Sequence, residues 1–436
     1  MTRRVVVTGM GTVTPHADDV DRLFEQLCAG VSAVRRIRSF DPSSVPSQIA
    51  AEVLYDLDVP ERFGPWDLGS RAMQFTHAAG VRTLASAGLP SLAEDDHAGR
   101  ARRAVHLAVG VGSTAMEALG PATIAAWGVV EDRGGGDAVA FRRAAADTPE
   151  DAAVLEEWFV DQAAPLLGAM LGASSVTTAA SACASGSHAV LDAVNRIRLG
   201  QSDVVLTGGV CTPITRSMMP GFALLSALTI NNDPPEGASR PFDGGRSGFI
   251  MAEGCSLLVL EELGHALARG ATIHGEVLGV GIATDSYRLT DPEPGGRGMG
   301  DAMRRALGDA SLPPSAVDYI NAHGTSTKMN DAAETLAMKR VFGGRESVPP
   351  VSSSKSMFGH LIHAAGVTEA IVCLKSIAQG RIHPTINQTD PDPDCDLDYV
   401  PNVARDLDVK VAMNNSFGFG GQNVSLVLGA WDGSAA

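Results

Sequence analysis

Ser-Ala-Cys-Ala-Ser-Gly-Ser-His, residues 181–188, is the stretch that decides the fold, because it joins a strand to a helix through a turn of small residues. The β-branched run 175–180 predicts a buried strand before it, and apolar residues at helical spacing over 188–199 predict a helix after it. Cys183 would then face the first unpaired N–H groups of that helix, whose partial positive charge favours a thiolate. A free cysteine is more often just a small buried residue, so a nucleophile also needs a nearby base.

The composition of the chain indicates what kind of protein it is and which partners it disfavours. Its 436 residues, of which 44% are hydrophobic, suffice for a core of two or three domains. The net charge of −16 argues against nucleic acid as the main partner. The sequence enters a strand at once without an apolar signal segment, and no stretch reaches the roughly 20 apolar residues of a membrane span. Six scattered cysteines without a CxxC pair disfavour zinc and disulfides, so we expect a cytoplasmic protein that binds no membrane.

Strand and helix patterns alternate along two successive halves of the chain. Strands are predicted at 4–9, 105–111, 203–208, 273–281, 317–320, 351–354, 410–414 and 423–428, and a strand pair at 248–261. Helices are predicted at 21–29, 68–87, 300–310 and 363–379. This alternation predicts an α/β fold with a mainly parallel sheet and helices on its faces. The order suggests a duplication into residues 1–262 and 263–436, with 131–164 as an acidic surface excursion.

Three further stretches place polar residues beside glycine at predicted strand ends, where open α/β sheets carry their sites. They are Asn-Ala-His-Gly-Thr-Ser-Thr (321–327), Ser-Lys-Ser-Met-Phe-Gly-His (354–360) and Phe-Gly-Phe-Gly-Gly (417–421). A single histidine is more often structural, but two histidines, a lysine and a turn-borne cysteine together indicate one reactive centre. Metal binding is disfavoured, because His360 and His363 are three residues apart and no acidic partner is in place.

These motifs, with Ser-Arg-Pro-Phe-Asp (239–243) and Gly-Phe-Ile-Met-Ala-Glu-Gly (248–254), resemble those of the β-ketoacyl-[acyl-carrier-protein] synthases, type II condensing enzymes of the thiolase superfamily. The resemblance runs nearly end to end. It implies the thiolase fold, with duplicated βαβαβ halves and mixed, mainly parallel sheets in an α/β/α/β/α arrangement. It further implies decarboxylative condensation of a cysteine-bound acyl group with malonyl-acyl-carrier protein, in fatty-acid or type II polyketide synthesis, without cofactor or metal.

The resemblance assigns the acyl-binding roles. The N–H groups of Cys183 and Phe419 would form an oxyanion hole for the acyl group, since donors must be aimed in advance at the developing charge. Phe419 also resembles a gate that moves on the hinge glycines Gly418 and Gly420. Substrate contacts are expected from Phe222, Thr325, Thr327 and Phe417, although Phe222 is as well explained as a plain core aromatic.

The resemblance also assigns the decarboxylation roles. His323 and His360 would donate hydrogen bonds to the enolate of the malonyl thioester, and either could also assist CO2 loss. Lys355 would form a charge network with Glu334 that orients the two histidines rather than react itself.

The chain departs from the usual synthase pattern at several positions. Ser181 stands where threonine is common, and His363 where a small residue is usual, so His363 could alter the packing behind His360 or contact substrate. The excursion 131–164 is longer and more acidic than usual. The helix predicted at 68–87 carries few basic residues for an acidic carrier protein, so the candidates for docking are Arg71, Arg82, Arg35, Arg36, Arg38, Arg142 and Arg143.

Three other functions compete with this interpretation. A chain-length-factor-like subunit would lack the nucleophile that Cys183 supplies. A thiolase would carry a second catalytic cysteine, for which Cys395 in its acidic loop is a poor substitute. An acyltransferase that has lost decarboxylation is the third. The resemblance, together with a strand before Cys183 apolar enough to pair across a two-fold axis, implies a dimer, formed with a second copy or with a chain-length-factor-like subunit.

Overall fold

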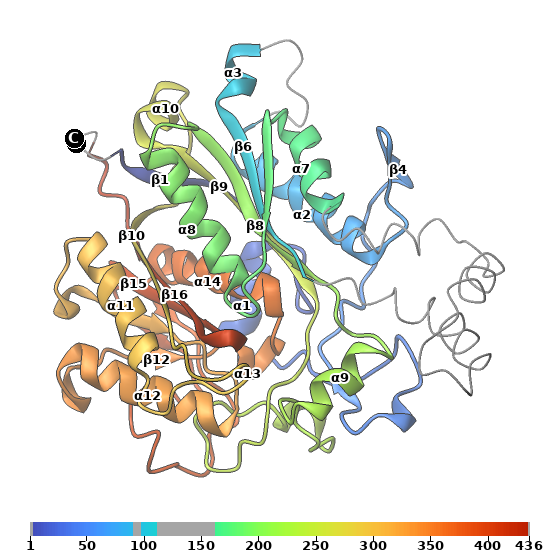
Figure 1. Cartoon of the computed structure of the whole chain (residues 1–436), viewed down its shortest axis with the longest axis vertical. Coiled ribbons are helices and arrows are strands. Elements are labelled where there is room, and N and C mark those ends of the chain that lie inside the picture. Colours follow the sequence, from blue (N-terminus) through green and yellow to red (C-terminus); the bar gives the residue numbers. More distant parts are fainter. Residues whose placement is uncertain (1–2, 90–96, 111–161, 435–436) are drawn as a thin grey trace, which may run out of the picture.

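A ten-stranded sheet forms the centre of the protein (Figure 1). The computed structural model describes residues 3–89, 97–110 and 162–434, so the excursion predicted at 131–164 lies almost wholly outside the described residues, as do Arg142 and Arg143. The strands are β1 (Val5–Val13), β6 (Arg103–Ala108), β7 (Ser175–Ala179), β8 (Val204–Cys211), β9 (Gly254–Glu262), β10 (Gly275–Thr284), β11 (Tyr319–Asn321), β12 (Val351–Ser352), β15 (Val411–Gly418) and β16 (Gln422–Gly429).

One strand order occurs twice in this sheet. The first half reads β7-β6-β8-β9-β1 from its edge inward, and the second half reads β12-β11-β15-β16-β10. Numbered along the chain within each half, both orders are third, second, fourth, fifth, first. The two halves meet where β1 pairs with β10 over two residue pairs. The repeat confirms the predicted duplication, whereas the boundary at 262/263 stays a prediction.

The sheet is mixed, but its pairing is less parallel than predicted. The outer pairs β12–β11, β11–β15, β8–β6 and β6–β7 are parallel. The five central pairs, from β15–β16 through β1 to β9–β8, are antiparallel. Sequence periodicity cannot distinguish the two, because a strand buried on both faces reads as a continuous apolar run in either pairing.

Helices cover the sheet in layers that complete the expected α/β/α/β/α arrangement (Figure 1). Helices α2 (Arg71–Ser86) and α7 (Ala163–Leu171) pack outside the first half, and α11 (Arg297–Asp309) and α12 (Lys328–Phe342) outside the second. Between the halves lie α8 (Ser185–Arg198) and α14 (Ala365–Gln379), which contact each other and strands of both halves. The remaining described helices are α1 (Val20–Cys28), α3 (His97–Ala101), α9 (Met218–Leu224), α10 (Leu263–Ala268) and α13 (Lys355–Phe358). Across the described ranges, no helix combines the length and the hydropathy that a membrane crossing requires.

Two predicted strands turn out differently. The strand before Cys183 is exposed rather than buried, since Val176, Thr177 and Thr178 of β7 face solvent. The reason is that β7 is an edge strand paired only with β6. The strand pair predicted at 248–261 is a single strand, β9, because residues before Gly254 make only isolated bridges, such as that between Met251 and His360.

Candidate active site

The ends of several strands from both halves converge on one cavity of about 290 Å³. Cys183 follows β7, His323 follows β11, His360 follows β12, and Phe419 follows β15. The residues predicted from the sequence that line this cavity are Cys183, His323, Thr325, Thr327, His360, Phe417, Gly418 and Phe419. The other predicted residues, Glu334, Lys355, Phe222 and Gly420, do not line it. The structure therefore brings residues predicted for acyl binding and residues predicted for decarboxylation to one cavity.

The turn that presents Cys183 is held in an unusual backbone conformation. Ala182 has a φ of +49°, in the left-handed region that residues with a Cβ rarely adopt. Ser185 stabilises this turn from both sides, because its Oγ accepts from the N–H of Ser181 at 2.7 Å and donates to the carbonyl of Ala182 at 2.6 Å. Helix α8 begins at Ser185, so the cysteine sulfur lies just before its N-terminus.

The Cys183 sulfur is buried and lies among hydrogen-bond donors. Burial raises the pKa of Cys183 to about 11, although the positive charge of Lys355 and the backbone N–H groups of Phe419 and Cys183 itself act to lower it. The thiolate expected from the helix N-terminus is therefore not the resting form at neutral pH, because desolvation outweighs the donors. The two N–H groups at the sulfur are those the sequence assigned to an oxyanion hole.

The turn that carries Phe419 approaches the nucleophile turn closely. A Cβ on Gly418 would lie 3.0 Å from both the Cys183 nitrogen and the Ser181 oxygen, so only glycine fits there without displacing them. Gly420 has a φ of +79°, which glycine adopts without strain. These two glycines thus have different roles, one steric and one conformational.

Replacement of Gly418 by alanine is expected to slow acylation of Cys183 by roughly 100-fold, since the new methyl group would displace the nucleophile turn by a fraction of an ångström. The acylation rate is measured by intact mass after mixing with an acyl thioester. Gly308→Ala is the matched control, because a Cβ there meets no atom within 4 Å. An unchanged acylation rate in Gly418→Ala would show that the close approach is not needed.

The two histidines lie close together at the cavity as neutral rings. Their rings form an edge-on pair with centroids 5.3 Å apart. Burial, followed by the positive charge of Lys355, holds the pKa of both His323 and His360 well below the usual range. Nδ1 of His360 accepts from the backbone N–H of Ile362 at 3.2 Å, which places the proton of the neutral ring on Nε2. That Nε2 is buried without a partner among the described residues. It is an N–H donor available to a substrate oxygen.

The buried lysine has a different partner from the one predicted. Lys355 forms its ion pair with Glu369 of α14, and both side chains are fully buried. Glu334 instead accepts from the backbone N–H groups of His323 and Gly324, each at 2.9 Å, and so fixes the loop that carries the histidine. Burial raises the pKa of both carboxyl groups to about 7. Sequence reasoning missed Glu369, for which the signal was a single acid within an apolar helix.

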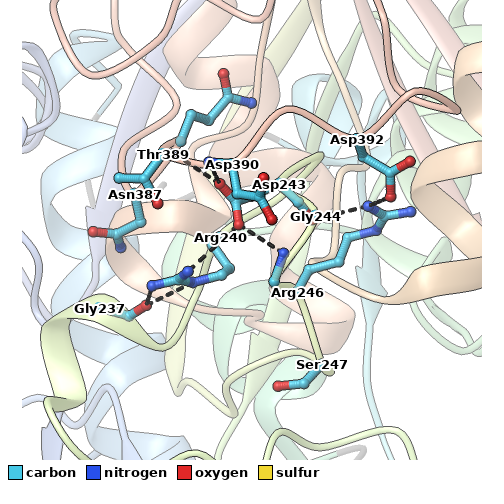
Figure 2. A network of polar contacts seen from close by, with 12 residues as sticks. Gly237, Arg240, Asp243, Gly244, Arg246, Ser247, Asn387, Thr389, Asp390 and Asp392 are labelled. Carbon is cyan, nitrogen blue, oxygen red and sulfur yellow. Dashed lines mark hydrogen bonds and ion pairs between the residues drawn. The ribbon is translucent and has the colours of Figure 1, made fainter.

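A second buried charge cluster fixes the Thr325–Lys328 wall of the cavity. The Arg246 guanidinium donates to the carbonyls of Thr327 and Lys328, each at 3.1 Å. It also forms an ion pair with Asp392 (Figure 2). Nearby, Asp243 accepts from the backbone N–H groups of Thr389 and Asp390 (Figure 2). It also accepts from the N–H of Gly245. Together these contacts connect the loops 237–247 and 387–392 to the segment 325–328, which lines the cavity.

The predicted acyl-pocket aromatic lies in the apolar cluster that surrounds Cys183. Phe222 packs edge-on against Phe249, with centroids 5.9 Å apart, and Phe249 packs in the same way against His360 at 5.1 Å. The cluster also contains Cys211, Ile214, Met219, Ile362 and Phe419. Phe222 is thus both a packed aromatic and a neighbour of the catalytic centre.

The predicted carrier-docking arginines divide into two groups. Arg71 is held by Glu253 and by the carbonyl of Val53, and Arg82 by Asp18, so both are engaged within the protein. Arg35, Arg36 and Arg38 are exposed and adjacent in sequence.

Comparison with known proteins identifies the chain as a relative of condensing enzymes. The family model for the β-ketoacyl synthase N-terminal domain matches residues 2–123 and 161–266, and the model for the C-terminal domain matches residues 274–389. The chain is 38% identical to actinorhodin polyketide putative β-ketoacyl synthase 1 of Streptomyces coelicolor, over 98% of this chain and 88% of that protein. It is 37% identical to 3-oxoacyl-[acyl-carrier-protein] synthase 2 of Synechocystis, over 98% of both chains.

Solved structures show the same likeness. One, described as a type II polyketide acyl-carrier protein in complex with its ketosynthase bound to the hexaketide, matches with a TM-score of 0.86 and 31% identity over 99% of this chain and 100% of that one. Another, the ishigamide ketosynthase/chain length factor, matches with a TM-score of 0.84 and 34% identity over 99% and 100%. These matches confirm the thiolase-type fold expected from the sequence, and the chain belongs to the β-ketoacyl synthase family.

Proposed function

We propose that this protein condenses an acyl group held on Cys183 with malonyl-acyl-carrier protein, releasing CO2 and a β-ketoacyl-acyl-carrier protein. The observation that carries the proposal is the single cavity shared by the sulfur of Cys183, two backbone donors beside it, and the neutral rings of His323 and His360. A nucleophile and two separate sets of oxyanion donors are what a two-stage condensation requires.

In the first stage, the Cys183 sulfur attacks the carbonyl of an acyl thioester. The negative charge that develops on oxygen is stabilised by the N–H groups of Cys183 and Phe419. The carrier thiol then leaves and takes up the proton that the cysteine gives up. Because the pKa of Cys183 is raised, the thiolate is formed only as the reaction proceeds.

In the second stage, a malonyl thioester enters on the side of the cavity lined by Thr325 and Thr327. Cleavage of its C–CO2 bond leaves an enolate, whose oxygen accepts from the Nε2–H of His360 and from His323. The enolate carbon attacks the acyl carbonyl on Cys183. Collapse of the tetrahedral intermediate expels the cysteine sulfur, which regains a proton. The buried ion pair between Lys355 and Glu369 lies near the two histidines and takes no part in bond making or breaking.

The carrier protein is the proposed partner in both stages. Arg35, Arg36 and Arg38 form an exposed basic group suited to an acidic carrier, and Arg216 lies near it over the ring of Phe40. The structural relative that was solved with an acyl-carrier protein supports this kind of partner.

A second protomer is the other proposed partner. The exposed edge of β7 leaves backbone groups available for pairing with another strand, and it leads directly into Cys183. The partner would be a second copy or a chain-length-factor-like subunit, as in the ishigamide ketosynthase/chain length factor. We further propose a cytoplasmic location, which the six unpaired cysteines support.

Reconstitution tests the proposed reaction. Purified protein, alone and with a chain-length-factor relative, is mixed with malonyl-carrier protein and a panel of acyl-carrier proteins, and the products are identified by mass spectrometry. We expect a β-ketoacyl carrier two carbons longer than the acyl donor, with one CO2 released per condensation. Acylation of the protein without CO2 release above background, in every combination, would indicate an acyltransferase instead.

A further inference from the structure

A second cysteine–histidine pair lies beside the nucleophile and has no role in the reaction described above. The Sγ of Cys211 and the Nδ1 of His363 are 3.3 Å apart. Cys211 ends β8, and His363 lies in a short 3-10 turn (Ile362–Ala364) before α14. The His363 ring lies against the backbone of Gly110, just beyond β6, where a Cβ would come within 2.3 Å of its Cε1. The pair therefore lies at the same end of the parallel strands as Cys183.

The Cys211–His363 pair is close to both parts of the catalytic centre. Burial raises the pKa of Cys211 to about 12, although the backbone N–H of His363 acts to lower it. On the histidine side, the backbone of His363 approaches the first turn of α8, because a Cβ on Gly186 would lie 2.7 Å from the His363 carbonyl oxygen. Cys211 also packs in one apolar cluster with Cys183. Neither residue lines the cavity itself, so an acyl chain on Cys183 would meet the pair where it extends into this apolar cluster.

The chemistry of the pair differs from that of the apolar residues around it. Burial lowers the pKa of His363 to about 4, so its ring is neutral at pH 7. The Cys211 thiol is also neutral, and its S–H can donate to Nδ1. The ring proton then resides on Nε2, which makes that atom a hydrogen-bond donor. His363 keeps part of its surface accessible, although its neighbours Ile362 and Ala364 are buried.

We propose that the Cys211–His363 pair selects acyl chains that carry a carbonyl or hydroxyl oxygen over saturated chains of equal length. A saturated chain offers the imidazole N–H no acceptor and leaves a polar group unpaired beside hydrocarbon, whereas an oxygen on the chain satisfies it. The inference rests on the proposed condensing function, because only an acyl chain on Cys183 would contact the pair. The enzyme would then elongate acyl chains that still carry oxygen, that is, incompletely reduced chains.

A competition experiment tests this selection. Hexanoyl, 3-hydroxyhexanoyl and 5-oxohexanoyl carrier-protein thioesters are mixed in pairs with the full-length protein, and acylation of Cys183 is followed by intact mass. At least one oxygenated chain should exceed hexanoyl in kcat/KM by roughly tenfold, the effect of one neutral hydrogen bond. His363→Leu, which keeps the volume without a donor, should bring that ratio close to one. His363→Gln, which keeps an N–H donor, should retain it.

The outcomes separate this inference from the proposed function. Cys395→Ala is the control, because Cys395 lies in a different core cluster and should leave the ratio unchanged. If hexanoyl matches both oxygenated chains in the unmodified protein, or if His363→Leu keeps the full preference, the inference is overturned while the condensing function stands. If no acyl thioester acylates Cys183, the proposed function itself fails.

Discussion

Replacing Cys183 by alanine is expected to abolish condensation, with a loss of about 10⁴-fold or more, because Cys183 is the one thiol among the described residues that line the cavity. Cys183→Gln is expected to behave differently. The glutamine amide resembles an acylated cysteine in shape, and its carbonyl can accept from the backbone N–H groups of residue 183 and Phe419. The variant should therefore still release CO2 from malonyl-carrier protein. The two variants are compared by product mass spectrometry and by release of labelled CO2.

Cys255→Ala is the matched control for these variants, since Cys255 is also fully buried but belongs to another core cluster. It should condense at close to the rate of the unmodified protein. Condensation that persists in Cys183→Ala would mean that another residue accepts the acyl chain, and the role of Cys183 would have to be withdrawn.

Replacing either His323 or His360 by alanine is expected to slow CO2 release far more than acylation of Cys183. Acylation relies on the backbone donors at the sulfur, whereas decarboxylation places charge where the Nε2–H of His360 has no other partner among the described residues. Loss of one preorganised donor to an oxyanion costs about 100- to 1,000-fold, or roughly 3–4 kcal/mol of barrier. Acyl-enzyme formation and labelled CO2 release are measured separately for each variant.

His274→Ala serves as the control for the histidine variants, because His274 lies away from the cavity and contacts Ser86. Its rates of acyl-enzyme formation and of CO2 release should both equal those of the unmodified protein. If His323→Ala and His360→Ala instead lost acylation and kept CO2 release, the assignment of the histidines to the second stage would be wrong.

Much of the site could be predicted from the sequence because its chemistry is concentrated in short motifs at strand ends. The strand–turn–helix around Cys183 and the loops holding His323, His360 and Phe419 are local features, and small residues with flanking strands identify them. Eight predicted residues line the one cavity for this reason. The duplication also followed from the order of the elements, and the strand order confirms it.

The features of the site that could not be predicted depend on contacts between segments far apart in the sequence. The partner of Lys355 is Glu369, because α13 and α14 place these side chains together, and no spacing rule distinguishes that acid from Glu334. The pKa of Cys183 depends on how completely the fold buries it, which outweighs the local effect of the helix N-terminus. The exposure of β7 reflects its edge position, which the apolar character of its residues does not reveal.

Peptide mapping of the acylated protein shows directly whether Cys183 carries the acyl chain. The unmodified protein is mixed with an acyl-carrier protein for less than one turnover, quenched, digested and analysed by tandem mass spectrometry. We expect the acyl group on Cys183 before any of the other five cysteines. An acyl group found mainly on Cys211 or Cys255 would contradict it.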